Sequence, residues 1–323
     1  MGQNPYDHTA PVRDPDLFFG RGPELQRATE IICKAACLSL VGGPHCGLTS
    51  LLYHLQSPGF VACCEEQAGG LRFVYLDCAK LNDPIEIIRY VLAEINPRRR
   101  IPDRGPGWRS LQGTLISTLS HTRQNATRVV LLMDNFEPLG AKEGAVEFLE
   151  SLRALSQRIE MTMITATRTE LKNCCHQDVV SSPFPNIFQV EYVEAWHPDE
   201  TAQFVRDTSE VSGVDLTAHI ERVSDWSGGI PLLAQILCGL LFDGAVGGGE
   251  IAWRAVHQAA SETAAACLDD IWRHFTAKEQ ALLIAAAQGD PLGDVPGSLQ
   301  GKGYLLGDQL ASRALADYAL GRA

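Results

Sequence analysis

The chain has 323 residues, 45% hydrophobic and 20% charged, a composition typical of soluble globular proteins and a length that allows two or three domains. The formal net charge of -12 argues against nucleic acid or an anionic membrane as a partner, because both are bound through basic surfaces. The sequence contains no apolar run of about 18 residues and no signal-peptide pattern, so we expect no membrane span and a cytoplasmic location.

The first 195 residues alternate short apolar runs with amphipathic stretches. After a proline-rich N-terminal arm, helical spacing is expected at 23–38, 84–95, 108–124 and 144–159, and the apolar runs predict strands at 39–43, 71–78, 127–135, 161–167 and 187–194. Strands without polar alternation, separated by helices, are typical of a parallel sheet covered on both faces. This part therefore predicts an α/β domain with a five-stranded, mainly parallel sheet.

From residue 196 onward only helical periodicity remains. Helices are predicted at 197–211, 215–226, 230–242, 250–260, 262–275 and 278–287. Pro231 is expected to open the apolar third helix of this series, because the first turn of a helix tolerates proline. The helix at 278–287, a loop and the segment 299–320 together predict a small helix-turn-helix or winged module.

A glycine-rich loop follows the first predicted strand and precedes an amphipathic helix. This layout places backbone amides around a nucleotide phosphate. The loop reads G-x-x-x-x-G-L-T, with Leu48 where the phosphate-loop pattern has lysine, and Thr49 stands at the position whose hydroxyl coordinates Mg²⁺. The candidate nucleotide-binding residues are Gly42, Gly43, Pro44, His45, Cys46, Gly47, Leu48, Thr49 and Ser50.

A second motif, "RVVLLMDN", is an apolar strand that ends in Asp134. A carboxylate at such a strand end can hold Mg²⁺ through water, although it can equally cap the following turn. Its occurrence together with the glycine loop favours the Mg²⁺ role for Asp134, with Thr49 as the second metal-binding residue.

These motifs, in this order, resemble the bacterial STAND-type P-loop ATPases of the AAA-like branch, with degenerate Walker A and Walker B motifs. The similarity extends to "FFGRGPEL" near the N-terminus, "TSLL" after the loop, "HQDVVSSPFPNIF", "SGGIPLLAQILC" and "LDDIWRHFTAKEQALLIAAA". The resemblance implies ATP or ADP with Mg²⁺ as cofactors. It implies that Phe19, Gly20 and Arg21 lie beside the adenine, and it marks Pro231 as a nucleotide-side residue, although Ile230 replaces the histidine usual before that proline.

The resemblance also implies a domain order. We expect an N-terminal arm at 1–22, a P-loop NTPase domain at 23–195, a helical lid at 196–262 and a winged-helix-like domain at 263–323. Arg168, just past the fourth predicted strand, is implied to sense the γ-phosphate, although a helix-capping or ion-pairing role is equally compatible with its position.

Two residues differ from the family pattern at positions that the expected chemistry uses. Leu48 removes the ammonium that bridges the β- and γ-phosphates, and Asn135 stands where the family has a glutamate that polarises the attacking water. An amide can orient water but cannot take its proton, so hydrolysis is expected to be slow. One hydrogen bond to a charged group contributes about 1.5–3 kcal/mol, so binding should weaken by about 10- to 100-fold without being lost. His45 and Glu137 are candidate substitutes.

Four functions remain open from the sequence. The favoured one is a nucleotide-dependent signalling switch whose output passes through a protein partner or self-association. The alternatives are a pseudoATPase scaffold that binds no nucleotide, a slow active ATPase that uses substitute residues, and a DNA-binding regulator. The last is disfavoured because residues 264–323 contain five Lys/Arg and seven Asp/Glu, a net charge of -2.

Overall fold

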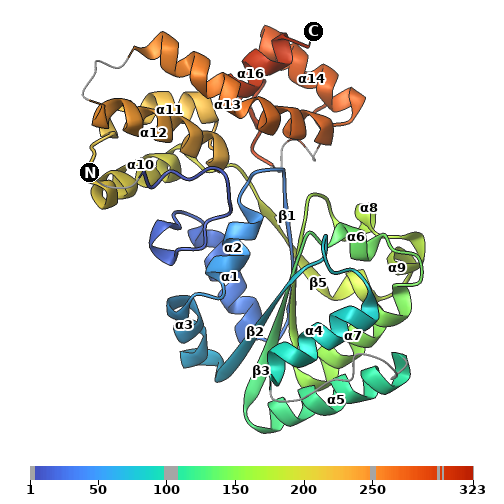
Figure 1. The fold of residues 1–323 in the computed structure, drawn as a ribbon. Helices are drawn as coiled ribbons and strands as arrows, with labels where there is room; N and C mark the ends of the chain where they lie inside the picture. The colour runs from blue at the N-terminus through green and yellow to red at the C-terminus, as the bar shows by residue number, and fades with distance from the viewer. Residues whose placement is uncertain (1–3, 98–107, 248–251, 297–298, 300–301, 323) are drawn as a thin grey trace. The chain divides into compact units, whose positions relative to one another are not determined.

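The structure is a computed structural model that describes residues 4–97, 108–247, 252–296, 299 and 302–322. It divides into two compact units (Figure 1). The first unit comprises Met1–Arg21, Gly42–Leu51 and Tyr192–Ala323, and the second comprises Gly22–Val41 and Leu52–Glu191. Within the described ranges, no helix is long and apolar enough to cross a membrane.

The main sheet has the strand order β2-β3-β4-β1-β5. Its strands are β1 (Cys37–Gly42), β2 (Gly70–Asp77), β3 (Thr127–Asp134), β4 (Thr162–Thr167) and β5 (Phe188–Val193). β2 pairs with β3, β3 with β4 and β4 with β1, all in parallel. β1 and β4 are buried at every residue, which explains why their sequences show no polar alternation. The predicted five-stranded α/β architecture is confirmed.

Helices of the second unit surround this sheet (Figure 1). They are α1 (Gly22–Cys33), α3 (Pro58–Ala68), α4 (Pro84–Ile95), α5 (Trp108–Gln124), α6 (Glu137–Gly140), α7 (Val146–Ile159), α8 (Leu171–Cys174) and α9 (Gln177–Ser181). Local signals determine several of their starts. For example, the Asp83 carboxylate caps α4 by accepting hydrogen bonds from the amides of Ile85 and Glu86. The prediction of a helix to residue 38 was wrong, because α1 ends at Cys33 and Ala35 adopts a φ of 50° before β1.

The first unit is mainly helical beyond β5. It contains α10 (Pro198–Ser212), α11 (Ile220–Ser227), α12 (Pro231–Val246), α13 (Trp253–His274), α14 (Ala277–Gln288) and α16 (Arg313–Leu320), with a two-stranded antiparallel sheet of β6 (Leu305–Leu306) and β7 (Gln309–Leu310). As predicted, α12 opens at Pro231. The two helices predicted at 250–260 and 262–275 are instead one continuous helix, α13, since only Ser261 lies between them and the alanines and glutamate around it are good helix formers.

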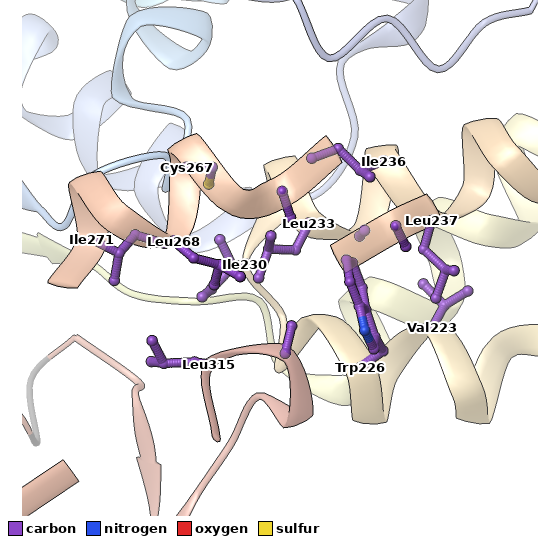
Figure 2. Close-up of a cluster of buried hydrophobic side chains, with 14 of the residues drawn as sticks. Val223, Trp226, Ile230, Leu233, Ile236, Leu237, Cys267, Leu268, Ile271 and Leu315 are labelled. Carbon is purple, nitrogen blue, oxygen red and sulfur yellow. The ribbon is translucent and has the colours of Figure 1, made fainter. Parts of the chain in front are cut away.

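Side chains from α11, α12, α13 and α16 form a common hydrophobic core (Figure 2). Trp226 of α11 belongs to it with 1% of its surface exposed, as do Leu237 of α12 and Leu268 of α13. Leu233 and Ile271 are fully buried in the same cluster. α12 therefore lies inside the helical unit, as its almost continuous apolar sequence predicts.

The turn between α11 and α12 requires two glycines. Gly228 and Gly229 have φ angles of 57° and 76°, and a Cβ on Gly229 would lie 2.0 Å from the carbonyl oxygen of Trp196. The Gly229 carbonyl in turn accepts a hydrogen bond from the Trp196 amide at 2.8 Å. This turn consequently fixes the chain just after β5 against the start of α12.

We expect Gly229→Ala to lower the free energy of unfolding by about 2 kcal/mol or more, since backbone strain and a backbone clash act together. Urea unfolding measures the effect. Gly244→Ala is the matched control, because a Cβ at this position of α12 meets nothing within 4 Å. Equal midpoints for the two variants would contradict the clash.

Candidate nucleotide-binding site

The glycine-rich loop connects β1 to α2 (Leu48–His54). His45 and Gly47 adopt φ angles of 64° and 92°, so the chain turns sharply between Gly43 and Leu48. A Cβ on Gly42 would lie 2.4 Å from Cys46 Sγ, which explains the glycine at the first position of the motif. Leu48 is half-buried rather than enclosed.

Arg21 of the N-terminal arm supports this loop. Its guanidinium donates one hydrogen bond to the carbonyl of Cys46 at 2.6 Å and another to the carbonyl of Glu194 at 2.7 Å. Its backbone amide donates to the Glu200 carboxylate at 3.2 Å. Only 4% of Arg21 is exposed. The arginine therefore ties the glycine loop to the segment that follows β5.

A small cavity lies beside this arginine, entirely within the first unit. Its interior of about 40 Å³ is well below the about 300–1,000 Å³ of small-molecule sites, so a nucleotide base would enter it only after lining side chains move. The walls are mostly apolar and aromatic, with a few polar groups, and are formed by Val12, Leu17, Phe18, Phe19, Arg21, Cys46, Gly47, Ser50, Trp196, Phe204, Pro231 and Gln235. Residues predicted from three distant parts of the sequence thus line one cavity: Phe19 and Arg21 of the arm, the glycine loop, and Pro231.

The aromatic wall of the cavity contains an unsatisfied donor. Trp196 is 92% buried, with 8% exposed, and packs against Phe204 with ring centroids 5.1 Å apart. Its indole Nε1 has no hydrogen-bond partner among the described residues. Leaving such a donor buried costs free energy, so a polar atom of a ligand in this cavity would be stabilised by it. Gly20, with a φ of 74°, runs past this nitrogen, and a Cβ there would lie 3.0 Å from it.

Helix α13 and Tyr304, both among the described residues from Trp253 onward, also contact the glycine loop. His45 Nε2 lies 3.2 Å from the Asp270 carboxylate of α13. The hydroxyl of Tyr304, 4% exposed, packs against Gly43 so closely that a Cβ on Gly43 would lie 2.0 Å from it. A side chain at the second loop position would therefore displace the Tyr304 ring, so packing within the protein favours glycine there.

In the second unit, Asp134 ends β3 at the carboxyl edge of the sheet. It is 2% exposed, and its carboxylate accepts hydrogen bonds from the Tyr75 hydroxyl at 2.7 Å and from the Asn135 amide at 3.0 Å. Burial and the neighbouring Asp134 carboxylate raise the pKa of Tyr75, so this hydroxyl stays protonated and keeps donating. The hydrogen bond from the backbone amide of Asn135 is the kind by which a carboxylate caps the following turn, which is the alternative role for Asp134.

Three further predicted residues surround this strand end. Asn135, exposed and with a φ of 47°, donates from its side-chain amide to the Asp77 carboxylate at 3.1 Å. The Glu137 carboxylate accepts a hydrogen bond from the backbone amide of Arg168 at 2.5 Å. Glu137 thus joins the start of α6 to the end of β4, and Arg168 itself is exposed.

Sequence reasoning missed several residues that the structure places around the loop and cavity. Trp196 and Gln235 line the cavity, while Asp270 and Tyr304 contact the loop. Trp196 directly follows the fifth predicted strand, but no motif distinguishes its side chain. Asp270 and Tyr304 are more than 220 residues from the loop in the sequence, and no local pattern reports contacts of that separation.

Comparison with known proteins gives both a family and a fold. The sequence profile of the family described as Novel STAND NTPase 2 matches residues 87–292, more than half of the chain. A search of curated protein sequences finds no match.

Solved structures match over most of the chain at low sequence identity. The Walker-type ATPase PABY2304 of Pyrococcus abyssi has a TM-score of 0.68 at 16% identity, covering 98% of this chain and 99% of that one. Aeropyrum pernix ORC2, solved in ADPNP-ADP complexes, has a TM-score of 0.65 at 13% identity, covering 90% and 78%. Aeropyrum pernix ORC1 in complex with DNA has a TM-score of 0.52 at 16% identity, covering 85% and 73%.

These structures share the fold of this chain. At such low sequence identities the similarity shows nothing about function. The ORC1 structure contains DNA. This comparison therefore does not support the expectation, drawn from the net charge, that nucleic acid is an unlikely partner. The profile match and the five-stranded sheet agree with the resemblance derived from the motifs. The chain therefore belongs to the Novel STAND NTPase 2 family, a group of P-loop nucleoside triphosphatases.

Proposed function

We propose that this protein is a nucleotide-dependent switch that binds ATP or ADP with Mg²⁺ and hydrolyses ATP slowly or not at all. The cavity of the first unit carries the proposal, because one apolar space is lined by Phe19 and Arg21, by the glycine loop and by Pro231. The free Nε1 donor of Trp196 supports a ligand with polar ring atoms, such as a purine.

The proposed division of roles follows from the residues. The apolar cavity would hold the base, and the amides between Gly43 and Thr49 would bind the phosphates. Thr49 and Asp134 would hold Mg²⁺, whose charge would offset that of the phosphates. The same proposal includes three domain boundaries, after residues 22, 195 and 262. It also includes a winged-helix fold for the last segment and a protein partner.

Slow hydrolysis is proposed because two groups that act on the γ-phosphate are replaced. Leu48 has no ammonium, and Asn135 cannot accept a proton. Glu137 is a weak candidate for a substitute base, since its carboxylate already accepts a hydrogen bond from the Arg168 amide. His45 is engaged by Asp270. We therefore favour binding over turnover as the activity that produces a signal.

Trp196→Phe tests the base end of the proposed site. The variant keeps most of the aromatic wall and removes the Nε1 donor, so we expect ADP affinity to fall by about 3- to 10-fold, the value of one neutral hydrogen bond of about 0.5–1.5 kcal/mol. Isothermal titration calorimetry with Mg-ADP measures it. Trp253→Phe is the control, since Trp253 is a half-buried tryptophan of α13 that does not line the cavity. An unchanged affinity in Trp196→Phe would contradict the assignment of this cavity to the base.

A further inference from the structure

Tyr75 of β2 places its hydroxyl on the carboxylate of Asp134, which ends β3. The two strands lie side by side in the sheet (Figure 1), and their parallel register pairs Asp77 with Asp134. Side chains two residues apart on a strand point to the same face, so Tyr75 and Asp77 share a face of the sheet. The Tyr75 hydroxyl reaches across to β3 and donates to Asp134 Oδ2 at 2.7 Å. The register of the two strands therefore brings this donor to the strand end.

Asp134 is held at both of its carboxylate oxygens. Oδ2 accepts the hydrogen bond from Tyr75, and Oδ1 accepts one from the backbone amide of Asn135 at 3.0 Å. Only 2% of Asp134 is exposed, so its charge depends on these donors more than on bulk water. An ionised carboxylate has about four acceptor sites, so it can accept these hydrogen bonds and one from a metal-bound water together.

The ring of Tyr75 is in turn packed against Tyr53 of α2. Their ring centroids lie 4.9 Å apart, with an angle of 32° between the ring planes. Both tyrosines are half-buried, and both belong to the second unit together with Asp134. A tyrosine side chain has only two rotatable dihedral angles, so packing that holds its ring also fixes the position of its hydroxyl. Tyr75 is thus a rigid donor.

The neighbouring acid, Asp77, has different partners. Its carboxylate lies 2.8 Å from the Lys80 ammonium and accepts a hydrogen bond from the side-chain amide of Asn135 at 3.1 Å. Asp77 is therefore compensated by a cation and an amide. The tyrosine hydroxyl supports the more buried of the two carboxylates, the one to which the Mg²⁺ role is assigned.

We propose that Tyr75 is a positioning residue for the metal side of the nucleotide site, where its hydroxyl holds the Asp134 carboxylate in a fixed orientation toward the Mg²⁺ that accompanies the nucleotide. The inference rests on the proposed nucleotide-binding function and adds the group that orients the metal-binding carboxylate. Hydrogen-bond partners of metal-binding groups act on the metal, and their removal typically lowers metal affinity by about 10- to 100-fold. Tyr75 would act through Asp134 alone.

The dependence of ADP binding on Mg²⁺ tests the inference. Calorimetry measures ADP affinity in EDTA and at a series of Mg²⁺ concentrations, for the wild type, Tyr75→Phe, Asp134→Asn and the double variant. We expect Tyr75→Phe to raise the Mg²⁺ concentration that gives half of the gain in ADP affinity by about 10-fold, the lower end of the range because the metal is held through water. The ADP affinity in EDTA should stay unchanged. With Asn at position 134, Tyr75→Phe should have no further effect, because the charge that holds the metal is already absent.

Tyr90→Phe is the matched control, because Tyr90 is an exposed tyrosine of α4 in the same unit. Thermal unfolding of every variant checks the fold, and Tyr75→Leu replaces Tyr75→Phe if the latter does not fold. An unchanged Mg²⁺ requirement, or an equal loss of ADP affinity with Mg²⁺ and with EDTA, would overturn the positioning role and leave nucleotide binding intact. Binding of ADP that does not respond to Mg²⁺ in the wild type would overturn the metal role of Asp134 together with this inference. A wild type that does not bind ADP would instead overturn the proposed function itself.

Discussion

ATP hydrolysis by a Leu48→Lys/Asn135→Glu double variant is expected to be at least about 100-fold faster than by the wild type, since a general base alone contributes about 10²- to 10⁴-fold. The substitutions restore the cation that bridges the phosphates and the carboxylate that polarises water. Phosphate release under saturating Mg-ATP measures the gain. Each single substitution should yield less than the double variant, because bound phosphate and activated water are both needed.

The surroundings of Asn135 limit the increase in hydrolysis rate that Asn135→Glu can produce. Asn135 has a φ of 47°, a conformation that asparagine tolerates better than glutamate, and its side chain donates to Asp77. A glutamate would face the Asp77 carboxylate, although Lys80, 2.8 Å from Asp77, offsets part of the repulsion. Adding Asp134→Ala to the double variant is the control, and it should abolish the gain. A double variant that binds ATP but releases phosphate no faster than the wild type would contradict the proposal that Leu48 and Asn135 slow hydrolysis.

Trp226→Ala should have the largest effect on stability. The side chain is 1% exposed and lies in the core where α11, α12 and α13 meet (Figure 2). Replacing a buried tryptophan with alanine removes transfer free energy and leaves a cavity, at a cost of about 3–5 kcal/mol. Urea unfolding followed by far-ultraviolet circular dichroism measures the loss.

Trp253→Ala provides the comparison, because this half-buried tryptophan packs against the outside of the same cluster and contacts Arg222, whose guanidinium lies 4.0 Å from the ring centroid. Its cost should be less than half of that for Trp226→Ala. If the two substitutions lower the free energy of unfolding equally, Trp226 does not hold the core as described.

The regular elements of the α/β part could be predicted from hydrophobic periodicity. The predicted helices at 84–95 and 108–124 match α4 and α5, and the five apolar runs match the strands to within a few residues. Errors arose where periodicity is ambiguous. The segment after Cys33 continues with small and apolar residues that fit a helix or a strand, and α3 escaped prediction although Ser57 and Pro58 mark its start.

The candidate site could be predicted only where a motif marks it. The glycine loop, Phe19, Arg21 and Pro231 were chosen from sequence, and the structure places them around one cavity. The contributions of Trp196 and Tyr304 could not be predicted, because each depends on the tertiary packing of residues distant in sequence.

Calorimetric titration of the wild-type protein with Mg-ADP and Mg-ATP tests the central claim most directly. We predict saturable binding with a dissociation constant between about 1 µM and 1 mM, weaker than in an intact phosphate loop by the value of one charged hydrogen bond. Absence of binding at millimolar nucleotide would contradict the switch. It would leave the family fold as a scaffold for contacts with other proteins.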